Sequence, residues 1–280
     1  MTQGDVQREA RKKELRAFLL FWFAGVLVMF GIVFLALYAE PFLNWVFGKP
    51  ERKAGAKPQR VIDTIPKEIP TPPPDERLRV RKGMRLWLRA DAIERPDSSK
   101  LPYWADGSGT KHHAIQPMIP AQPMLIKKGI GEQPAVFFDG NNDYMHAGDV
   151  GPPDRFIPAT VFIVWAKPDS GRDFWQRIFS TGSRGIDYQN NGANYVPNVV
   201  VQHGRAPAPP HITVMRYTAP RDFSNFHIGR INVPGIQQFY RGFIAEMIVY
   251  GRVLSQQEIQ QVVRYLQQKY GIPPERTQVP

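Results

Sequence analysis

The stretch 243–250, Phe-Ile-Ala-Glu-Met-Ile-Val-Tyr, is followed after four residues by Ser255-Gln-Gln-Glu258. Its β-branched and aromatic residues predict a β-strand. The second part is a capping box, in which a serine hydroxyl and a glutamate carboxylate each satisfy a free backbone N–H where a helix begins. An apolar stripe at helical spacing comes next, and Gly271 provides the left-handed stop. The stripe consists of Ile259, Val262, Val263, Leu266 and Tyr270. The chain therefore ends in a strand followed by one amphipathic helix.

Seven further segments upstream have the same composition and are bounded by Gly, Pro, Asn and Asp. They are residues 86–90, 135–138, 160–165, 177–180, 199–201, 212–215 and 226–229. Short strands at such regular spacing are typical of an all-β sandwich. The sequence therefore predicts a mainly β domain at 79–280, an antiparallel sandwich of the jelly-roll type with one C-terminal helix.

Residues 17–39 contain no charged side chain. As a helix they would span about 34 Å, enough for the roughly 30 Å hydrocarbon core of a bilayer. This predicts one transmembrane helix, preceded by an N-terminal tail at 1–16. We expect aromatic residues in and after this helix to pack against lipid or other membrane helices, namely Trp22, Phe30, Phe34 and Trp45.

Residues 40–78 form an interfacial segment and a proline-rich linker. Seven prolines lie between Gly48 and Asp75. Such a stretch prefers an extended polyproline geometry, either as a passive spacer or as an arm along a partner. The net charge of the chain is +11, and the linker is basic. A basic segment near a membrane is attracted to anionic lipid, and the absence of a basic nucleic-acid-binding motif argues against nucleic acid.

Six blocks occur in an order that resembles a known family. They are residues 86–92 (LWLRADA), 104–109 (WADGSG), 134–140 (PAVFFDG), 160–164 (TVFIV), 226–230 (FHIGR) and 243–255 (FIAEMIVYGRVLS). This order, over residues 79–275, resembles bacterial domains of the concanavalin A-like lectin/glucanase superfamily, of the laminin-G-like type. The resemblance implies two stacked antiparallel sheets and an extracytoplasmic location. Because basic residues flank the apolar helix on both sides, charge alone does not orient it. We therefore expect, from the resemblance, a single-pass protein of the bacterial inner membrane with a periplasmic C-terminal domain.

Glucanases of this superfamily carry an E-x-D-x-x-E triplet on one strand, where one acid attacks and the other protonates. Glu246 has no partner acid in its segment, and nucleophile-elbow, zincin and P-loop motifs are also missing. We therefore expect no catalytic residues and no enzyme activity. His112 and His113 are adjacent, and neighbours on a strand face opposite ways, which does not favour a shared metal.

Two weak candidate sites remain. Asp139, Asn141 and Asp143 carry oxygen ligands that suit Ca²⁺, although a simple hairpin turn accounts for the same residues. A polar and aromatic stretch further along has the composition of a sugar-binding loop, or of an ordinary exposed loop. Its candidate glycan-binding residues are Trp175, Tyr188, Asn190 and Tyr195. Apart from Ca²⁺, the sequence predicts no cofactor.

The expected function is that of a non-catalytic accessory or structural subunit of a bacterial membrane complex. Photosynthetic, respiratory and secretion assemblies all fit. Its partners would be membrane protein subunits and the lipid bilayer. The alternative is a membrane-tethered, lectin-like module that binds carbohydrate, and a glycoside hydrolase is a third interpretation.

Overall fold

The computed structural model describes residues 65–151, 156–168, 176–182, 200–201, 208–231 and 238–279. All of them belong to one compact unit, Arg60–Pro280. The expected membrane helix at 17–39 lies outside these residues, as do Trp22, Phe30, Phe34 and Trp45. Within the described part of the chain, no helix is both long and apolar enough to cross a bilayer.

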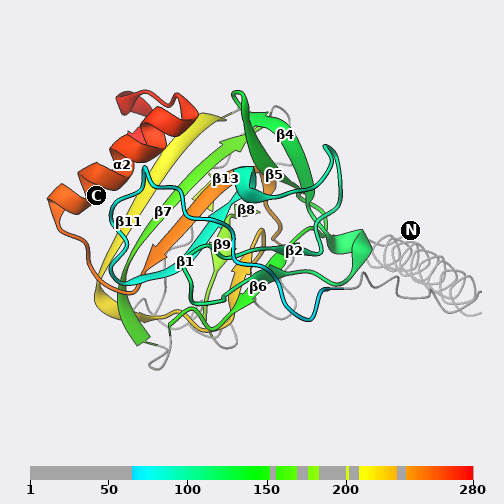
Figure 1. Cartoon of the computed structure of the whole chain (residues 1–280), viewed down its shortest axis with the longest axis horizontal. Helices are drawn as coiled ribbons and strands as arrows, with labels where there is room; N and C mark the ends of the chain where they lie inside the picture. The colour runs from blue at the N-terminus through cyan, green and yellow to red at the C-terminus, as the bar shows by residue number, and fades with distance from the viewer. Residues whose placement is uncertain are drawn as a thin grey trace, which may run out of the picture. The chain divides into compact units, whose positions relative to one another are not determined.

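The larger sheet has seven strands in the order β14-β11-β7-β13-β5-β4, with β1 also paired to β13 (Figure 1). All neighbours are antiparallel except β11 and β14, which run parallel. The strands are β1 (Met84–Arg89), β4 (Met124–Ile130), β5 (Gln133–Asp139), β7 (Phe156–Lys167), β11 (Ala208–Asp222), β13 (Arg241–Tyr250) and β14 (Thr277–Gln278).

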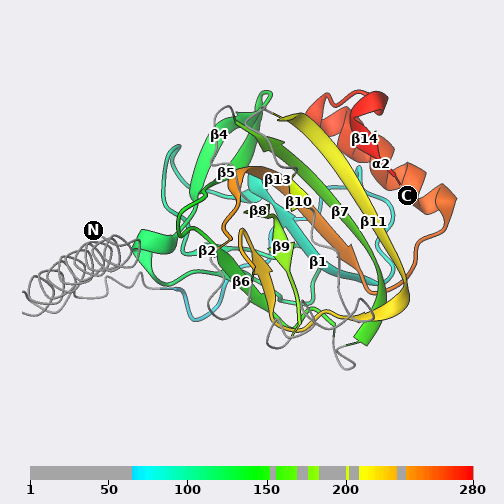
Figure 2. The ribbon, with the colours of Figure 1, turned by 180° about the vertical axis from the view of Figure 1, so that it is seen from behind.

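The smaller sheet has five strands in the order β2-β3-β6-β12-β9 and is seen from behind in Figure 2. Its strands are β2 (Tyr103–Trp104), β3 (Ala114–Ile115), β6 (Met145–Gly148), β12 (Phe226–Ile228) and β9 (Phe179–Ser180). A separate pair is formed by β8 (Gln176–Arg177) and β10 (Val200–Val201). Short 3-10 helices lie at η1 (Ala90–Ala92), η2 (Ile119–Ala121) and η4 (Pro274–Arg276).

The period-two alternation of β13 divides the core into two layers. Met247 and Val249 point into the cluster shared with the smaller sheet, which contributes Trp104 and Phe226. Ile248 and Tyr250, on the other face, belong to a second cluster with the apolar stripe of the helix. The domain therefore has three layers: the smaller sheet, the larger sheet and the helix α2 (Gln256–Tyr270).

Helix α2 begins and ends as the sequence predicts. Ser255 Oγ accepts a hydrogen bond from the Glu258 backbone N–H, the Glu258 side chain accepts one from the Ser255 N–H, and Gly271 adopts φ +62°. The carboxylate of Glu258 also pairs with Arg252 at 2.6 Å. The prediction of a mainly β domain with one C-terminal helix is confirmed at the level of two sheets and one helix.

The last part of the predicted linker packs against the domain. Leu78 is buried in the helix-side core cluster. The guanidinium of Arg81 lies 4.5 Å from the centroid of the Trp87 ring, and that of Arg89 lies 4.6 Å from it. Arg89 also donates a hydrogen bond to the Pro73 carbonyl. We call residues 70–81 the strap, because side chains of β1, β13 and α2 donate hydrogen bonds to it, from Arg89, Tyr250 and Tyr265.

Candidate functional site

A hollow of about 500 Å³ lies over strands β3, β6 and β12 of the smaller sheet. This volume falls within the range of small-molecule sites. Its wall is formed by Lys111, His113, Ile115, Gln116, Pro117, Tyr144, His146, Ala147, Gly148, His227 and Arg230. We call this hollow the histidine pocket, because three of its residues are histidines.

His227 fixes the position of Arg230. The guanidinium can only donate, so His227 Nε2 accepts the 2.9 Å hydrogen bond from Arg230 Nη2. The proton of the neutral ring is then on Nδ1, which donates to the Asn225 carbonyl at 2.9 Å. Burial, and then the charge of Arg230, lower the pKa of His227 to about 3. His227 therefore stays neutral at physiological pH and keeps this tautomer.

The ring of Tyr144 packs against the guanidinium of Arg230. The guanidinium carbon lies 3.7 Å from the centroid of the Tyr144 ring, a cation–π contact. Burial lowers the pKa of Arg230 from its usual value, but arginine stays protonated in proteins. The structure therefore presents a charged guanidinium that is held between an aromatic ring and an imidazole.

His146 covers the outer side of the buried His227. The two ring centroids are 4.6 Å apart, and the ring planes are inclined by 31°. His146 is exposed, so its outer face is open to a ligand. The pocket thus contains a flat exposed ring next to a fixed cation.

A tight loop around Asp106 positions His113. The buried Asp106 carboxylate accepts hydrogen bonds from the backbone N–H groups of Trp87 (2.8 Å) and His112 (3.0 Å). The Asp106 backbone N–H donates to His113 Nδ1 at 3.0 Å. His113 Nε2 therefore carries the proton of the neutral ring and is a donor. Burial lowers the pKa of His113, which favours this neutral form.

The charged residues that are described in the lining of the histidine pocket are all basic. The lining contains the basic residues Lys111 and Arg230, and none of the described residues that line the hollow is Asp or Glu. Within the described ranges, no group of three or more His, Cys, Asp or Glu residues is arranged to hold a metal. The hollow is therefore suited to accept negatively charged oxygens rather than cations.

Asp139 is the last residue of β5, and Asn141 and Asp143 lie in the turn that connects β5 to β6. Asp139 Oδ1 accepts from the backbone N–H of Asn141 at 2.8 Å. Asp143 Oδ2 accepts from the Asp139 N–H at 3.0 Å. Burial, and then the charge of Asp139, raise the pKa of Asp143 to about 6. These bonds close a turn, but the turn is not the expected hairpin, because β5 belongs to the larger sheet and β6 to the smaller sheet, and the two strands do not pair. The other candidates, Trp175, Tyr188, Asn190 and Tyr195, lie outside the described residues.

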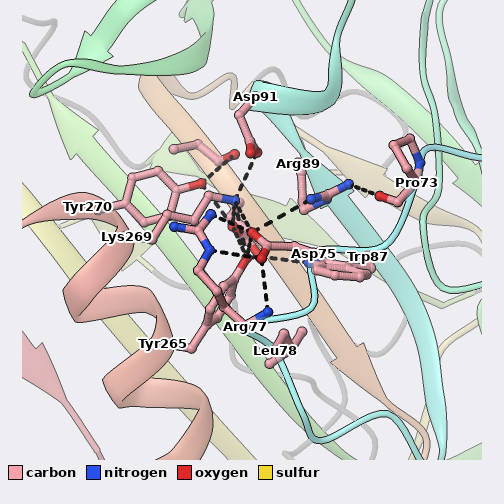
Figure 3. A network of polar contacts seen from close by, with 12 residues as sticks. Pro73, Asp75, Arg77, Leu78, Trp87, Arg89, Asp91, Tyr265, Lys269 and Tyr270 are labelled. Carbon is pink, nitrogen blue, oxygen red and sulfur yellow. Dashed lines mark hydrogen bonds and ion pairs between the residues drawn. The ribbon is translucent and has the colours of Figure 1, made fainter.

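A buried polar network joins residues of the strap, the larger sheet and helix α2, among them Asp75, Trp87 and Lys269 (Figure 3). Glu246 belongs to this network. Glu246 Oε1 accepts from Trp87 Nε1 at 2.7 Å, and Oε2 contacts Lys269 Nζ at 2.8 Å. Tyr265 and Tyr270 donate their hydroxyl groups to the same carboxylate. The Glu246 side chain is 0% exposed, so its partners are all internal.

No family model matches the sequence, and no curated protein does. Similar solved structures include sialidases of Trypanosoma rangeli. The complex with sialic acid shows 14% identity and a TM-score of 0.42, covering 75% of this chain and 36% of that one. A variant with trans-sialidase activity shows 14% identity and a TM-score of 0.39, covering 67% and 33%. This chain therefore spans about a third of the length of these structures.

This comparison contradicts two expectations from the sequence. The compared structures are glycoside hydrolases, whereas the sequence predicted a non-catalytic structural subunit without enzyme activity. Both predictions are withdrawn. The sequence argument relied on the missing E-x-D-x-x-E triplet, which excludes only one arrangement of catalytic acids.

Proposed function

We propose that this protein binds an acidic carbohydrate in the histidine pocket, and that its two sheets form a jelly roll of the concanavalin A-like type. The observation that carries the proposal is the composition of the pocket wall. Lys111 and Arg230 supply positive charge, His113 supplies an N–H, and none of the described lining residues is acidic. A sugar that bears a carboxylate satisfies this set of donors.

Arg230 is the proposed anchor for the carboxylate. A guanidinium binds a carboxylate through two parallel hydrogen bonds, and this geometry needs a fixed fork. Contacts with Tyr144 and His227 already hold the fork in place, so little conformational entropy is lost on binding. The exposed ring of His146 provides a flat surface for the apolar face of a sugar.

The proposed location follows from the expected membrane helix. A domain tethered on the extracytoplasmic side of a bacterial membrane would meet glycans at the cell surface. Sialic acid, present in one of the solved sialidase structures, is one carboxylate-bearing sugar to test. Glucuronic acid is a second, and it has a different ring substitution.

Calorimetric titration of the full chain in mild detergent tests the proposal. We expect sialic or glucuronic acid to bind and neutral glucose to bind at least tenfold more weakly. Arg230→Gln should weaken acid binding by about 10- to 100-fold, since hydrogen bonds to a charged group contribute about 1.5–3 kcal/mol. Release of free sugar from a sialoside is followed in parallel, so that turnover is not mistaken for weak binding.

Arg95→Gln is the matched control. Arg95 also lies over a tyrosine ring, 5.6 Å from the Tyr103 centroid, but it does not line the histidine pocket. It should leave the affinity unchanged. Equal affinity for acidic and neutral sugars, or an Arg230→Gln variant that binds like the wild type, would contradict the proposal.

A further inference from the structure

We propose that a second surface, a basic groove beside helix α2, binds the headgroups of anionic phospholipids. The groove encloses about 600 Å³ between the strap and the exposed side of the helix. It is lined by Glu76, Arg77, Arg79, Gln261, Arg264, Tyr265 and Gln268. We call it the arginine groove. Its lining has three arginines and one carboxylate, so its charge is positive.

Two of the three arginines have their donors available. Arg79 and Arg264 are exposed, and neither side chain makes a hydrogen bond or an ion pair with another described residue. Arg77 differs, because it donates to both carboxylate oxygens of Asp75, at 2.9 and 2.6 Å. The charge of Arg77 is therefore balanced by Asp75. The unpaired positive charges of the groove are those of Arg79 and Arg264. A guanidinium matches the oxygens of a phosphate as well as those of a carboxylate.

The position of the groove favours a lipid surface. Arg77 and Arg79 lie in the strap, the segment by which the chain passes from the basic linker into the domain. Helix α2 covers the larger sheet, whereas the histidine pocket lies on the smaller sheet. The domain can therefore contact lipid with one side and keep the pocket accessible on the other. Each basic residue at an anionic membrane strengthens binding about fivefold, so two of them give a measurable effect.

A quenching experiment on the full chain tests this inference. The sequence has no cysteine, so Gln268→Cys places a single fluorophore at the groove. The protein is inserted into nanodiscs that carry a headgroup quencher, with or without about 30% phosphatidylglycerol. We expect at least twofold stronger quenching in the anionic discs, and loss of that difference in 0.5 M salt because salt screens surface charge.

The double substitution Arg79→Gln with Arg264→Gln should remove the difference between the two lipids. Lys127→Gln with Arg216→Gln is the matched control, since it removes the same charge from exposed positions outside the groove. Equal quenching in both lipids, or a difference that survives the groove substitutions, would overturn the inference. An acidic protein segment would then be the better candidate occupant. Sugar binding is measured on the same variants, so failure of either proposal is seen separately.

Discussion

Lys269 lies at the centre of the buried polar network, where three carboxylates surround its ammonium group. Its Nζ lies 2.8 Å from Glu246, 2.9 Å from Asp91 and 3.8 Å from Asp75, and its side chain is 1% exposed. Burial raises the pKa of Asp75. The hydrogen bonds from Arg77 and the charges of Lys269 and Arg77 lower it by more, so this pKa lies far below its usual value. The network therefore joins the strap, the sheet and the helix through charge.

Replacing Lys269 alone should be severely destabilising. Lys269→Met leaves the buried Glu246 carboxyl without its cationic partner, and breaking a buried pair from one side costs about 3–5 kcal/mol. Adding Glu246→Gln should recover part of this loss, because the buried negative charge is then removed. Urea unfolding of the four members of this cycle measures the coupling. Exposed Lys127→Met is the control and should stay within about 0.5 kcal/mol of the wild type. A loss below about 1 kcal/mol for Lys269→Met would show that the network is not needed for stability.

At the scale of the element, helix α2 is specified mostly by its own residues. The capping box at Ser255 satisfies the first free N–H groups, and Gly271 ends the helix in a left-handed conformation. A Cβ atom at Gly271 would meet nothing within 4 Å. The cost of a side chain there is therefore conformational and does not include a steric clash with the rest of the domain.

Gly271→Ala should lower the free energy of unfolding by about 1 kcal/mol, because alanine resists a positive φ. Gly271→Asn should cost less, since asparagine tolerates this conformation. Thermal unfolding of the three proteins provides the measurement. Identical melting temperatures for the alanine variant and the wild type would mean that the helix end relaxes to another conformation.

At the scale of the whole molecule, the two proposed binding surfaces lie on different layers. The histidine pocket is built on the smaller sheet, and the arginine groove on helix α2 and the strap. The larger sheet separates them, and they share no residue. Sites without shared contacts behave additively, within about 0.3–0.5 kcal/mol.

The two surfaces should therefore respond independently to substitution. Arg230→Gln should weaken sugar binding without changing lipid-dependent quenching at residue 268. Arg79→Gln with Arg264→Gln should do the reverse, and the combined variant should show both losses at their single-variant size. Titration and quenching on the same preparations test this. A groove variant that also weakens sugar binding tenfold would instead indicate coupling through the domain.

The local sequence was sufficient to predict those elements whose structure depends on residues that are neighbours in the chain. The strand at β13 and the whole of helix α2 follow from β-branched composition, from helical spacing and from a capping box. The smaller sheet was predicted poorly for the opposite reason. Strand β6 has the sequence MHAG, and β3 has only two residues, so neither has a propensity signal. The predicted strand at 177–180 is divided at Ile178 into β8 and β9, which pair with different partners.

From the sequence alone, the mainly β composition of the domain and the terminal helix with its two ends could be predicted, because each depends on residues close together in the chain. The candidate sites could be located only in the tertiary structure, because their residues come from distant segments of the chain. The histidine pocket combines residues from 111–117, 144–148 and 227–230, and each histidine alone looked ordinary. Glu246 could be recognised as a buried ion-pair partner only once Lys269 and Trp87 were placed around it. The physical reason is that strand pairing between distant segments sets which side chains meet, and short-range propensity carries no information about that pairing.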